Sequence, residues 1–395
     1  MGMLSVPSLD CPVLRRLPRM ANQFGLEQET ARSLYRDLFA DCVAQARAHG
    51  IDLSQYNSLA IAADIDASRR ALGYDRIVYY GASYGAQLGQ HMMRDYTETI
   101  EAAILDGTSA LSVRSWMQDR VINVDEGVEH LIATCESDRK CAEAYDIRAL
   151  LDQAMALFGE GPIAATYADP TDPDIEVNLT LTEDDLAMAI YEMQTGQIFI
   201  RSLPAMLHLS VAEGRKSMAA VLGDMVGQKI VASRNSTSSG IATLMHAAVV
   251  CSDDTVRSID DMVVPEGASH FARIFGSVVL DEYLMFCDVV DVPALPDETD
   301  VDPIVDVPTL VLSGWLDVRT PTVRSLEVAK ALPNATLITF WGGSHVQLAE
   351  VNTRAAQIVS KFINDPSGEI DPSCVDEIPV RGFVLPDLSL SIEPD

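Results

Sequence analysis

A short apolar run that leads into a serine between two glycines is the feature that most constrains the fold. The segment RIVYYGASYGAQLGQ predicts a buried strand, a tight corner, and a helix that continues to about residue 96. The pattern Gly81-x-Ser83-x-Gly85 between a strand and a helix is typical of a nucleophile elbow, where bulk beside the serine is not tolerated. Such a turn lifts the Ser83 hydroxyl off the sheet, and the N–H of Tyr84 becomes a candidate donor to an oxyanion.

The two ends of the chain alternate strands and helices, whereas the middle is mostly helical. Helices are predicted over about 27–49, 58–72 and 349–363, and further buried strands over 101–108, 309–317 and 335–340. Residues 167–185 are interpreted as a loop that ends in a capping box, Thr182 with Asp185. We therefore expect an α/β fold with a mostly parallel sheet. Its core would comprise residues 1–109 and 301–395, with a helical cap over 110–300.

A serine hydroxyl becomes a good nucleophile only when a base takes its proton. Of the seven histidines, only His345 falls in a loop after a late predicted strand, and Asp317 follows the strand before it. Ser83, Asp317 and His345 follow one another in the order Ser, Asp, His, and all would lie at one edge of the sheet. Asp106 also ends a buried strand and is the rival acid.

Composition excludes several classes of function. The chain has 395 residues, of which 48% are hydrophobic, yet no apolar run approaches the ~18–20 residues that span a bilayer. The net charge of −30 repels phosphate backbones, so we expect no nucleic-acid partner and no membrane partner. No Cys/His spacing of a metal site occurs, and we expect neither a metal nor a cofactor.

Seven cysteines bear on localisation. Cys135 and Cys141 flank a segment short enough to close as a local disulfide, and the odd total leaves at least one thiol outside any intrachain pair. Three disulfides would indicate an oxidising compartment, outside the cell or in the periplasm. The alternative is seven reduced thiols in the cytoplasm, which stays open because the first twenty residues do not read as a signal peptide.

Four segments carry a resemblance to a known family. YYGASYGAQLGQ, AAILDGT, PTLVLSGWLDVRTP and GGSH resemble the α/β-hydrolase serine peptidases typified by tripeptidyl aminopeptidases and proline iminopeptidases, and the resemblance extends over most of the chain. It implies the α/β-hydrolase fold, with Ser83 as nucleophile, Asp317 as acid and His345 as base. It also implies the disulfides Cys135–Cys141 and Cys251–Cys287. Cys11 and Cys42 complete the set of disulfide candidates.

The chain departs from this family in two ways. The family has about four strands before the region that corresponds to residues 5–12, and with them a loop that lends a second N–H to the oxyanion. We therefore expect the N–H of Tyr84 to be the single oxyanion donor, and the nucleophile strand to lie at a sheet edge. A truncated reading of a longer protein would explain this, and a second chain that supplies the strands is the alternative. In addition, Arg354 stands where relatives often have a cysteine, which leaves Cys374 without its partner.

Three hypotheses for function follow. The first is a serine exopeptidase that removes residues or short peptides from free N-termini. Its carboxylate for the substrate ammonium would come from Glu192, Asp253 or Asp254. The second is a carboxylic ester hydrolase with the same three residues, because fold and triad do not determine the substrate. The third is a catalytically impaired remnant, which the absent oxyanion loop favours.

Overall fold

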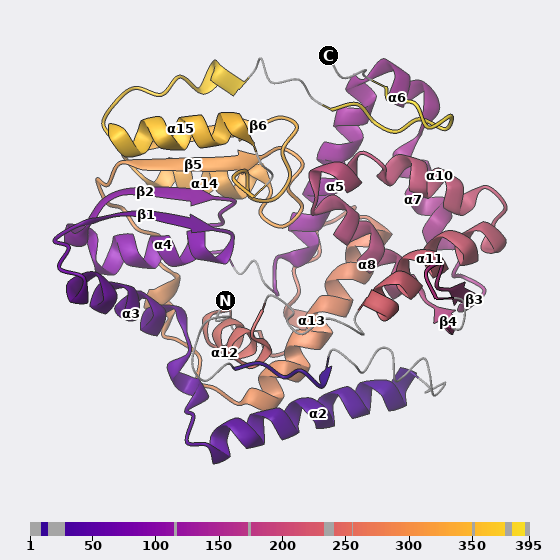
Figure 1. The fold of residues 1–395 in the computed structure, drawn as a ribbon, viewed down its shortest axis with the longest axis horizontal. Helices are drawn as coiled ribbons and strands as arrows, with labels where there is room; N and C mark the ends of the chain where they lie inside the picture. The colour runs from indigo at the N-terminus through magenta and orange to yellow at the C-terminus, as the bar shows by residue number, and fades with distance from the viewer. Residues whose placement is uncertain are drawn as a thin grey trace.

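The fold is built on a four-stranded parallel sheet, as the computed structural model shows (Figure 1). The structure describes residues 9–14, 28–113, 117–172, 175–232, 241–254, 256–349, 352–375 and 381–391. The strands lie in the order β1-β2-β5-β6, and every neighbouring pair is parallel. Their bounds are β1 Ile77–Ala82, β2 Ile100–Asp106, β5 Thr309–Gly314 and β6 Ala335–Phe340. The prediction of an α/β fold with a mostly parallel sheet is confirmed.

The strands are apolar because both faces of the sheet are covered. In β2, Ala102 and Ile104 belong to the core on one face, and Ala103 and Leu105 belong to the core on the other. Helix α15 (Thr353–Asn364) covers the first face, and α3 (Ser58–Ala71) and α4 (Tyr84–Asp95) cover the second (Figure 1). Burial on two faces explains why period-2 alternation is absent from these strands.

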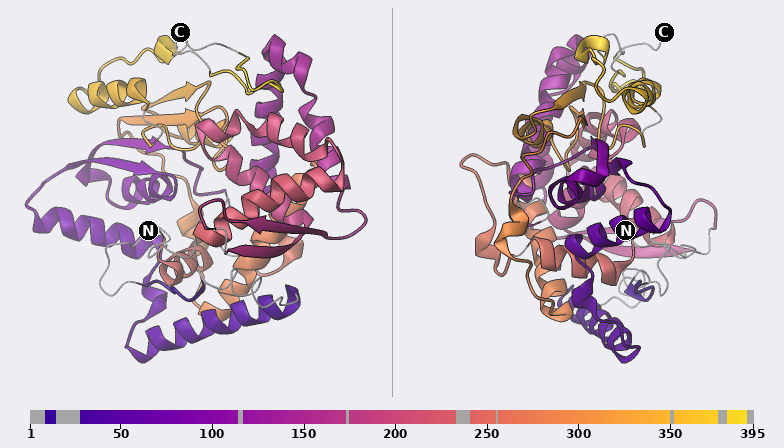
Figure 2. Two further views of the ribbon diagram at one scale, coloured as in Figure 1. Left: turned by 45° about the vertical axis from the view of Figure 1, so that its right-hand side comes forward. Right: turned by 90° about the vertical axis from the view of Figure 1, so that its left-hand side faces the viewer.

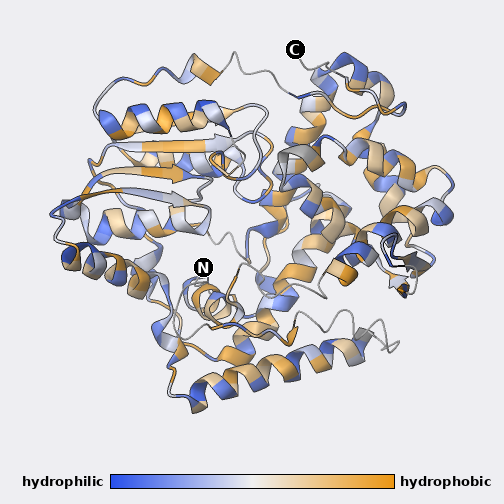
Figure 3. Cartoon of the chain, in the orientation of Figure 1, coloured by the Kyte–Doolittle hydropathy of each residue, from blue (hydrophilic) through white to orange (hydrophobic). Residues whose placement is uncertain are grey.

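Most of the remaining helices form a separate helical part beside the carboxyl ends of the strands (Figures 1 and 2). They are α5 (Arg120–Ser137), α6 (Arg139–Ala144), α7 (Ile147–Ala156), α8 (Glu183–Gln194), α9 (Gln197–Ile200), α10 (Leu203–Val211), α11 (Arg215–Ala232), α12 (Thr243–Asp253) and α13 (His270–Val290). Helix α14 (Thr322–Ala331) lies between β5 and β6 along the chain, and α2 (Gln28–Ala48) packs on α13. Short 3-10 turns occupy Leu53–Gln55, Thr97–Thr99, Ile259–Asp261, Asp297–Asp300 and Pro372–Val375. Hydrophobic residues predominate in the middle strands of the sheet, whereas the helices carry both hydrophobic and hydrophilic residues (Figure 3).

The interpretation of residues 167–185 as a loop is wrong. An antiparallel pair, β3 (Ile163–Ala168) and β4 (Glu176–Leu181), packs on α11. Every second residue of β4 is buried, which is the pattern of a strand with one solvent-exposed face. The capping box of Thr182 and Asp185 is present at the start of α8, as predicted. The last helix begins at Thr353, four residues later than expected, because the Asn352 side chain accepts the N–H of Ala355 and caps it there.

Three disulfides join segments of the chain. They pair Cys11 with Cys42, Cys135 with Cys141, and Cys251 with Cys287. The first ties residues 9–14 to α2, the second joins α5 to α6, and the third joins α12 to α13. Cys374 has a free thiol.

The outer edge of β1 is the remaining feature that bears on the site. Within the described part of the chain, β1 pairs with β2 alone and ends the sheet on that side. Tyr80 of this strand is 44% exposed, so the edge carries apolar surface. No helix in the described ranges is both long and apolar enough to cross a membrane.

Candidate active site

Ser83 occupies a strained corner between β1 and α4. Its φ of 54° and ψ of −124° lie where residues other than glycine are rarely found. The Ser83 N–H donates to the carbonyl oxygen of Asp106 at 2.9 Å, which fixes the corner to the end of β2. A Cβ at Gly81 would lie 2.1 Å from the carbonyl oxygen of Gly85, so glycine is required at position 81. At Gly85 a Cβ would meet no atom within 4 Å.

Asp317 and His345 form a buried pair. The imidazole Nδ1 lies 2.8 Å from a carboxylate oxygen of Asp317, whose side chain is fully buried. Asp317 also accepts the N–H of Arg319, and both the N–H and the hydroxyl of Thr320. Burial alone would raise the pKa of Asp317, but the charge and hydrogen bond of His345, with those of Thr320, hold it below the usual range. The carboxylate therefore stays ionised and fixes the ring with Nε2 directed away from it.

The Ser83 corner and the imidazole each lie next to the end of β2. A Cβ at Gly107 would lie 3.3 Å from the His345 ring and 3.2 Å from the Thr320 hydroxyl, and Gly107 directly follows the residue that binds the Ser83 N–H. Ser83 and Thr320 line one pocket. Nε2 of His345 is buried and has no hydrogen-bond partner among the described residues. This nitrogen can therefore accept a proton when substrate brings the groups into line.

Asp106, the rival acid, binds the backbone beyond the imidazole. Its carboxylate accepts the N–H of Gln347 at 2.8 Å and that of Leu348 at 3.0 Å, and Tyr80 donates its hydroxyl at 3.3 Å. Burial raises the pKa of Asp106, although these donors oppose the shift. Its hydrogen-bonding partners thus assign Asp106 to the support of the His345 loop rather than to the ring itself.

Helix α4 begins at Tyr84, which places its N–H at the positive end of the helix dipole beside Ser83. The Tyr84 side chain turns away from Ser83. Its hydroxyl lies 2.8 Å from that of Ser58, which in turn hydrogen-bonds Asp253. Burial raises the pKa of Asp253 to about 6, against the effect of the Ser58 donors.

The pocket at Ser83 is small, about 50 Å³. Its lining consists of Ser83, Tyr84, Gln87, Ser109, Arg120, Tyr191, Arg319 and Thr320. The three predicted amine ligands lie outside it. Glu192 forms an ion pair with Lys229 on another groove of the helical part. Asp253 and Asp254 line a cavity of about 30 Å³ that shares Tyr84 and Gln87 with the Ser83 pocket.

Two family models match the chain at its two ends. The model of the α/β hydrolase fold matches residues 29–201, and a model described as TAP-like protein matches residues 271–374. The first covers the Ser83 corner and the second covers both Asp317 and His345. Over these two stretches the chain is similar to α/β hydrolases and to TAP-like proteins. The predicted resemblance to this family is thus confirmed.

The curated proteins similar to this chain include proteins named serine protease Hip1. Those of Mycobacterium tuberculosis (strain ATCC 25618 / H37Rv) and Mycobacterium bovis are each 24% identical over 330 residues, which are 80% of this chain and 62% of theirs. The chain thus spans about three fifths of the length of these relatives. These comparisons give no support to the expectation of a second chain that completes the sheet.

Solved structures are also similar to this chain, at lower sequence identity. A meta-cleavage product hydrolase from Pseudomonas fluorescens IP01 is 14% identical with a TM-score of 0.34, over 78% of this chain and 72% of that one. A thermophilic esterase from Thermogutta terrifontis is 15% identical with the same TM-score, over 79% and 74%.

Sequence reasoning missed several residues of the site. Thr320, which binds Asp317 and lies 3.4 Å from Nδ1 of His345, was signalled only by being a hydroxyl three residues past the acid. Arg319 and Tyr191 come from different parts of the chain and share one pocket wall, with the guanidinium 5.7 Å from the ring centroid. No local pattern in the sequence could have placed them together. Within the described ranges, no cluster of His, Cys, Asp and Glu could hold a metal.

Proposed function

We propose that this chain is a serine hydrolase that cleaves peptide bonds through an acyl-enzyme on Ser83. The proposal is carried by Ser83, which lies on a strained strand-to-helix corner. The buried Asp317–His345 pair follows strands of the same sheet. The family models and the relatives named as serine proteases support the same chemistry. The roles of Ser83, Asp317 and His345 remain part of this proposal.

The steps follow from the groups present. His345 Nε2 takes the Ser83 proton as the Ser83 oxygen attacks the carbonyl carbon, and the ionised Asp317 stabilises the resulting imidazolium. The tetrahedral oxyanion is stabilised at the start of α4 by the N–H of Tyr84. The imidazolium then protonates the leaving amine, and the acyl-enzyme forms. Water, deprotonated by the same Nε2, releases the acid and restores Ser83.

We propose further that the peptidase acts on free N-termini. The support is the cavity lined by Asp253 and Asp254, which adjoins the Ser83 pocket at Tyr84 and Gln87. Carboxylates there favour an ammonium group next to the reacting carbonyl. Glu192 is the weaker candidate because Lys229 already neutralises it.

An ester hydrolase is the second candidate. The same serine, imidazole and carboxylate would serve an ester as well as an amide, so these groups do not separate the two substrates. An ester also needs less help than an amide to expel its leaving group.

We propose that residues 110–300 act as a cap over the core formed by residues 1–109 and 301–395. Their helices lie beside the carboxyl ends of the strands, and Arg120 and Tyr191 line the Ser83 pocket (Figure 1). We also propose a location outside the cell or in the periplasm. Three disulfides support it, because disulfides persist in oxidising compartments.

A fluorophosphonate probe tests the nucleophile directly. We expect covalent labelling of the wild-type chain and none of Ser83→Ala, with thermal unfolding showing that both are folded. Folded wild-type protein that takes no label would favour the impaired remnant and contradict the proposal.

The substrate class is tested on three compounds: an aminoacyl arylamide, its N-blocked form, and a short-chain aryl ester. A kcat/KM at least about tenfold higher for the free amine than for the blocked form supports exopeptidase action, since tenfold corresponds to ~1.4 kcal/mol. Hydrolysis of the ester alone would assign the second candidate.

A further inference from the structure

The pocket beside Ser83 presents hydrogen-bond donors and no carboxylate. Two of its lining residues are arginines, and the others contribute hydroxyl, amide or aromatic groups. Its volume of about 50 Å³ leaves room for a small polar group, since a cavity needs only ~10–15 Å³ of such space to hold one water molecule.

Ser109 supplies a donor that has no partner among the residues the structure describes. The residue is 1% exposed, and its hydroxyl oxygen makes no hydrogen bond with any of them. Its position is fixed, because the Gln90 side-chain amide donates to the Ser109 carbonyl at 2.7 Å. An unsatisfied buried hydroxyl costs ~1–3 kcal/mol, which an acceptor on a bound ligand would recover.

Arg319 supplies a full positive charge. Its backbone is held by Asp317, which accepts the Arg319 N–H at 2.8 Å. Its guanidinium lies over the ring of Tyr191, and no Asp or Glu of the described chain forms an ion pair with it. No Asp or Glu in the described part of the chain lines this pocket, so the Arg319 charge is available to an anionic ligand.

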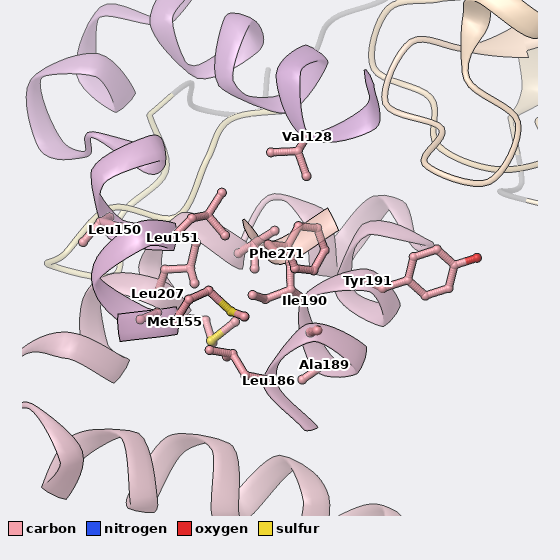
Figure 4. Packing of buried hydrophobic residues seen from close by; sticks show 14 of the residues in the cluster. Val128, Leu150, Leu151, Met155, Leu186, Ala189, Ile190, Tyr191, Leu207 and Phe271 are labelled. Atoms are coloured by element: carbon pink, nitrogen blue, oxygen red, sulfur yellow. The ribbon is translucent and has the colours of Figure 1, made fainter. Parts of the chain in front are cut away.

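Tyr191 keeps the guanidinium in place. It stacks on Phe275 with the ring centroids 4.1 Å apart, and it extends away from the middle of the apolar cluster of the helical part (Figure 4). Buried Arg120, 6% exposed, lines the same pocket. The Arg319 guanidinium, held against Tyr191, gives this wall a group that can bind an anion.

We infer that this pocket binds a carboxylate that the substrate carries within one residue of the scissile bond. The inference rests on the proposed function and adds the substrate class: short peptides with a free C-terminus, or peptides with an acidic side chain at that position. The carboxylate would accept from the Ser109 hydroxyl and the Arg319 guanidinium. The cavity lined by Asp253 and Asp254, which adjoins this pocket at Tyr84 and Gln87, would then face the opposite end of the substrate.

Matched substrates distinguish the two sources of the carboxylate. Trialanine is compared with trialanine amide, and Ala-Glu-Ala amide with Ala-Gln-Ala amide, with the released amines quantified by mass spectrometry. Within each pair, only the presence of the carboxylate changes. We expect kcat/KM to be about tenfold higher for the carboxylate member of at least one pair, because charge-assisted bonds are worth ~1.5–3 kcal/mol.

Variants assign the preference to the pocket. Arg319→Gln should reduce the preference to about twofold or less, Arg319→Lys should restore part of it, and Ser109→Ala should reduce it about threefold. The control is Arg139→Gln on α6, whose side chain is 87% exposed and lies outside the pocket. It should leave the preference unchanged.

A binding measurement on an inactive variant tests the inference without turnover. Calorimetry on Ser83→Ala should show about tenfold tighter binding of the carboxylate peptide than of its neutral partner, and Arg319→Gln in that background should abolish the difference. Equal binding and equal kcat/KM within both pairs would overturn the inference. So would a preference that survives Arg319→Gln. Fluorophosphonate labelling of the same wild-type preparation separates the two proposals. If Ser83 is labelled, the proposed function stands even though the carboxylate inference has failed; if it is not labelled, both have failed.

Discussion

Two buried carboxylates hold the His345 loop, and they do different things. Asp317 binds the ring at Nδ1, whereas Asp106 binds the amides of Gln347 and Leu348. Between them, Val346 has a φ of 65°, a conformation that costs a β-branched residue energy. The two hydrogen bonds to Asp106 offset that cost, so Asp106 positions the imidazole through the backbone.

Because the two carboxylates have different roles, we expect substitution of Asp317 to lower kcat more than substitution of Asp106. Asp317→Asn should lower kcat by ~10³–10⁴, because the amide no longer favours the correct tautomer or stabilises the imidazolium. Asp106→Asn keeps one acceptor but sets its NH₂ against a backbone N–H. It should lower kcat by ~10–100-fold with little change in KM, as a displaced catalytic group does.

Steady-state kinetics and the rate of fluorophosphonate labelling measure both variants, with thermal unfolding to show that each is folded. If Asp106→Asn were as damaging as Asp317→Asn, Asp106 would be the acid after all. A change in KM alone would place Asp106 in substrate binding.

At the scale of elements, the corner between β1 and α4 depends on one of its two glycines. A Cβ at Gly81 would clash with the backbone of Gly85 and lie 2.7 Å from the Tyr79 ring, whereas Gly85 has open space. The expectation that both positions must lack bulk is not matched by the packing at position 85.

The pair gives a matched experiment. Gly81→Ala should displace the start of α4, destabilise the fold by ~1–3 kcal/mol as overpacking does, and abolish labelling of Ser83. Gly85→Ala should stay within about 1 kcal/mol of the wild type and keep its labelling. Urea unfolding and probe labelling measure both effects. Equal tolerance of the two substitutions would mean that the corner is looser than the structure shows.

Prediction from the sequence succeeded where the signal was local. All four sheet strands were predicted, because each is a short apolar run bounded by turn residues. The pair β3–β4 was missed because the turn between its strands is rich in proline and aspartate, a composition typical of a loop. The alternation of polar and apolar residues in EVNLTL did indicate a strand. Contacts such as Asp106 with Leu348 join residues far apart in the chain. No periodicity encodes them, so the support of the loop became visible only in the fold.

At the scale of the whole molecule, one polar cluster joins the helical part to the sheet. Asp253 ends α12, Ser58 begins α3 and Tyr84 begins α4, and their side chains form one hydrogen-bonded chain. Burial raises the pKa of Asp253 to about 6, and the negative charge of nearby Asp300 adds to the shift. The protonation of this single carboxyl therefore affects the contact between the two parts.

The sign of the effect on stability follows from linkage. Between about pH 4 and pH 6 the folded chain retains a proton on Asp253 that the unfolded chain has lost, since its ordinary pKa is 3.8. The contribution of this group to the free energy of unfolding therefore decreases as pH rises, by up to ~1.4 kcal/mol per unit, and levels off above about pH 6. Below about pH 4 both states are protonated and the contribution is constant.

Asp253→Asn removes this titration while keeping an acceptor for Ser58. The free energy of unfolding of the wild type, relative to Asp253→Asn, should thus fall by ~2–3 kcal/mol from pH 4 to pH 7, as urea unfolding at unit intervals would show. Asp64→Asn, at an exposed position of α3, is the control and should give a flat difference. A flat or rising difference for Asp253→Asn would mean that Asp253 is ionised in the fold across this range. The cavity beside Ser83 would then carry a full negative charge at every working pH, and an ammonium group would bind there without an acid-dependent loss of affinity.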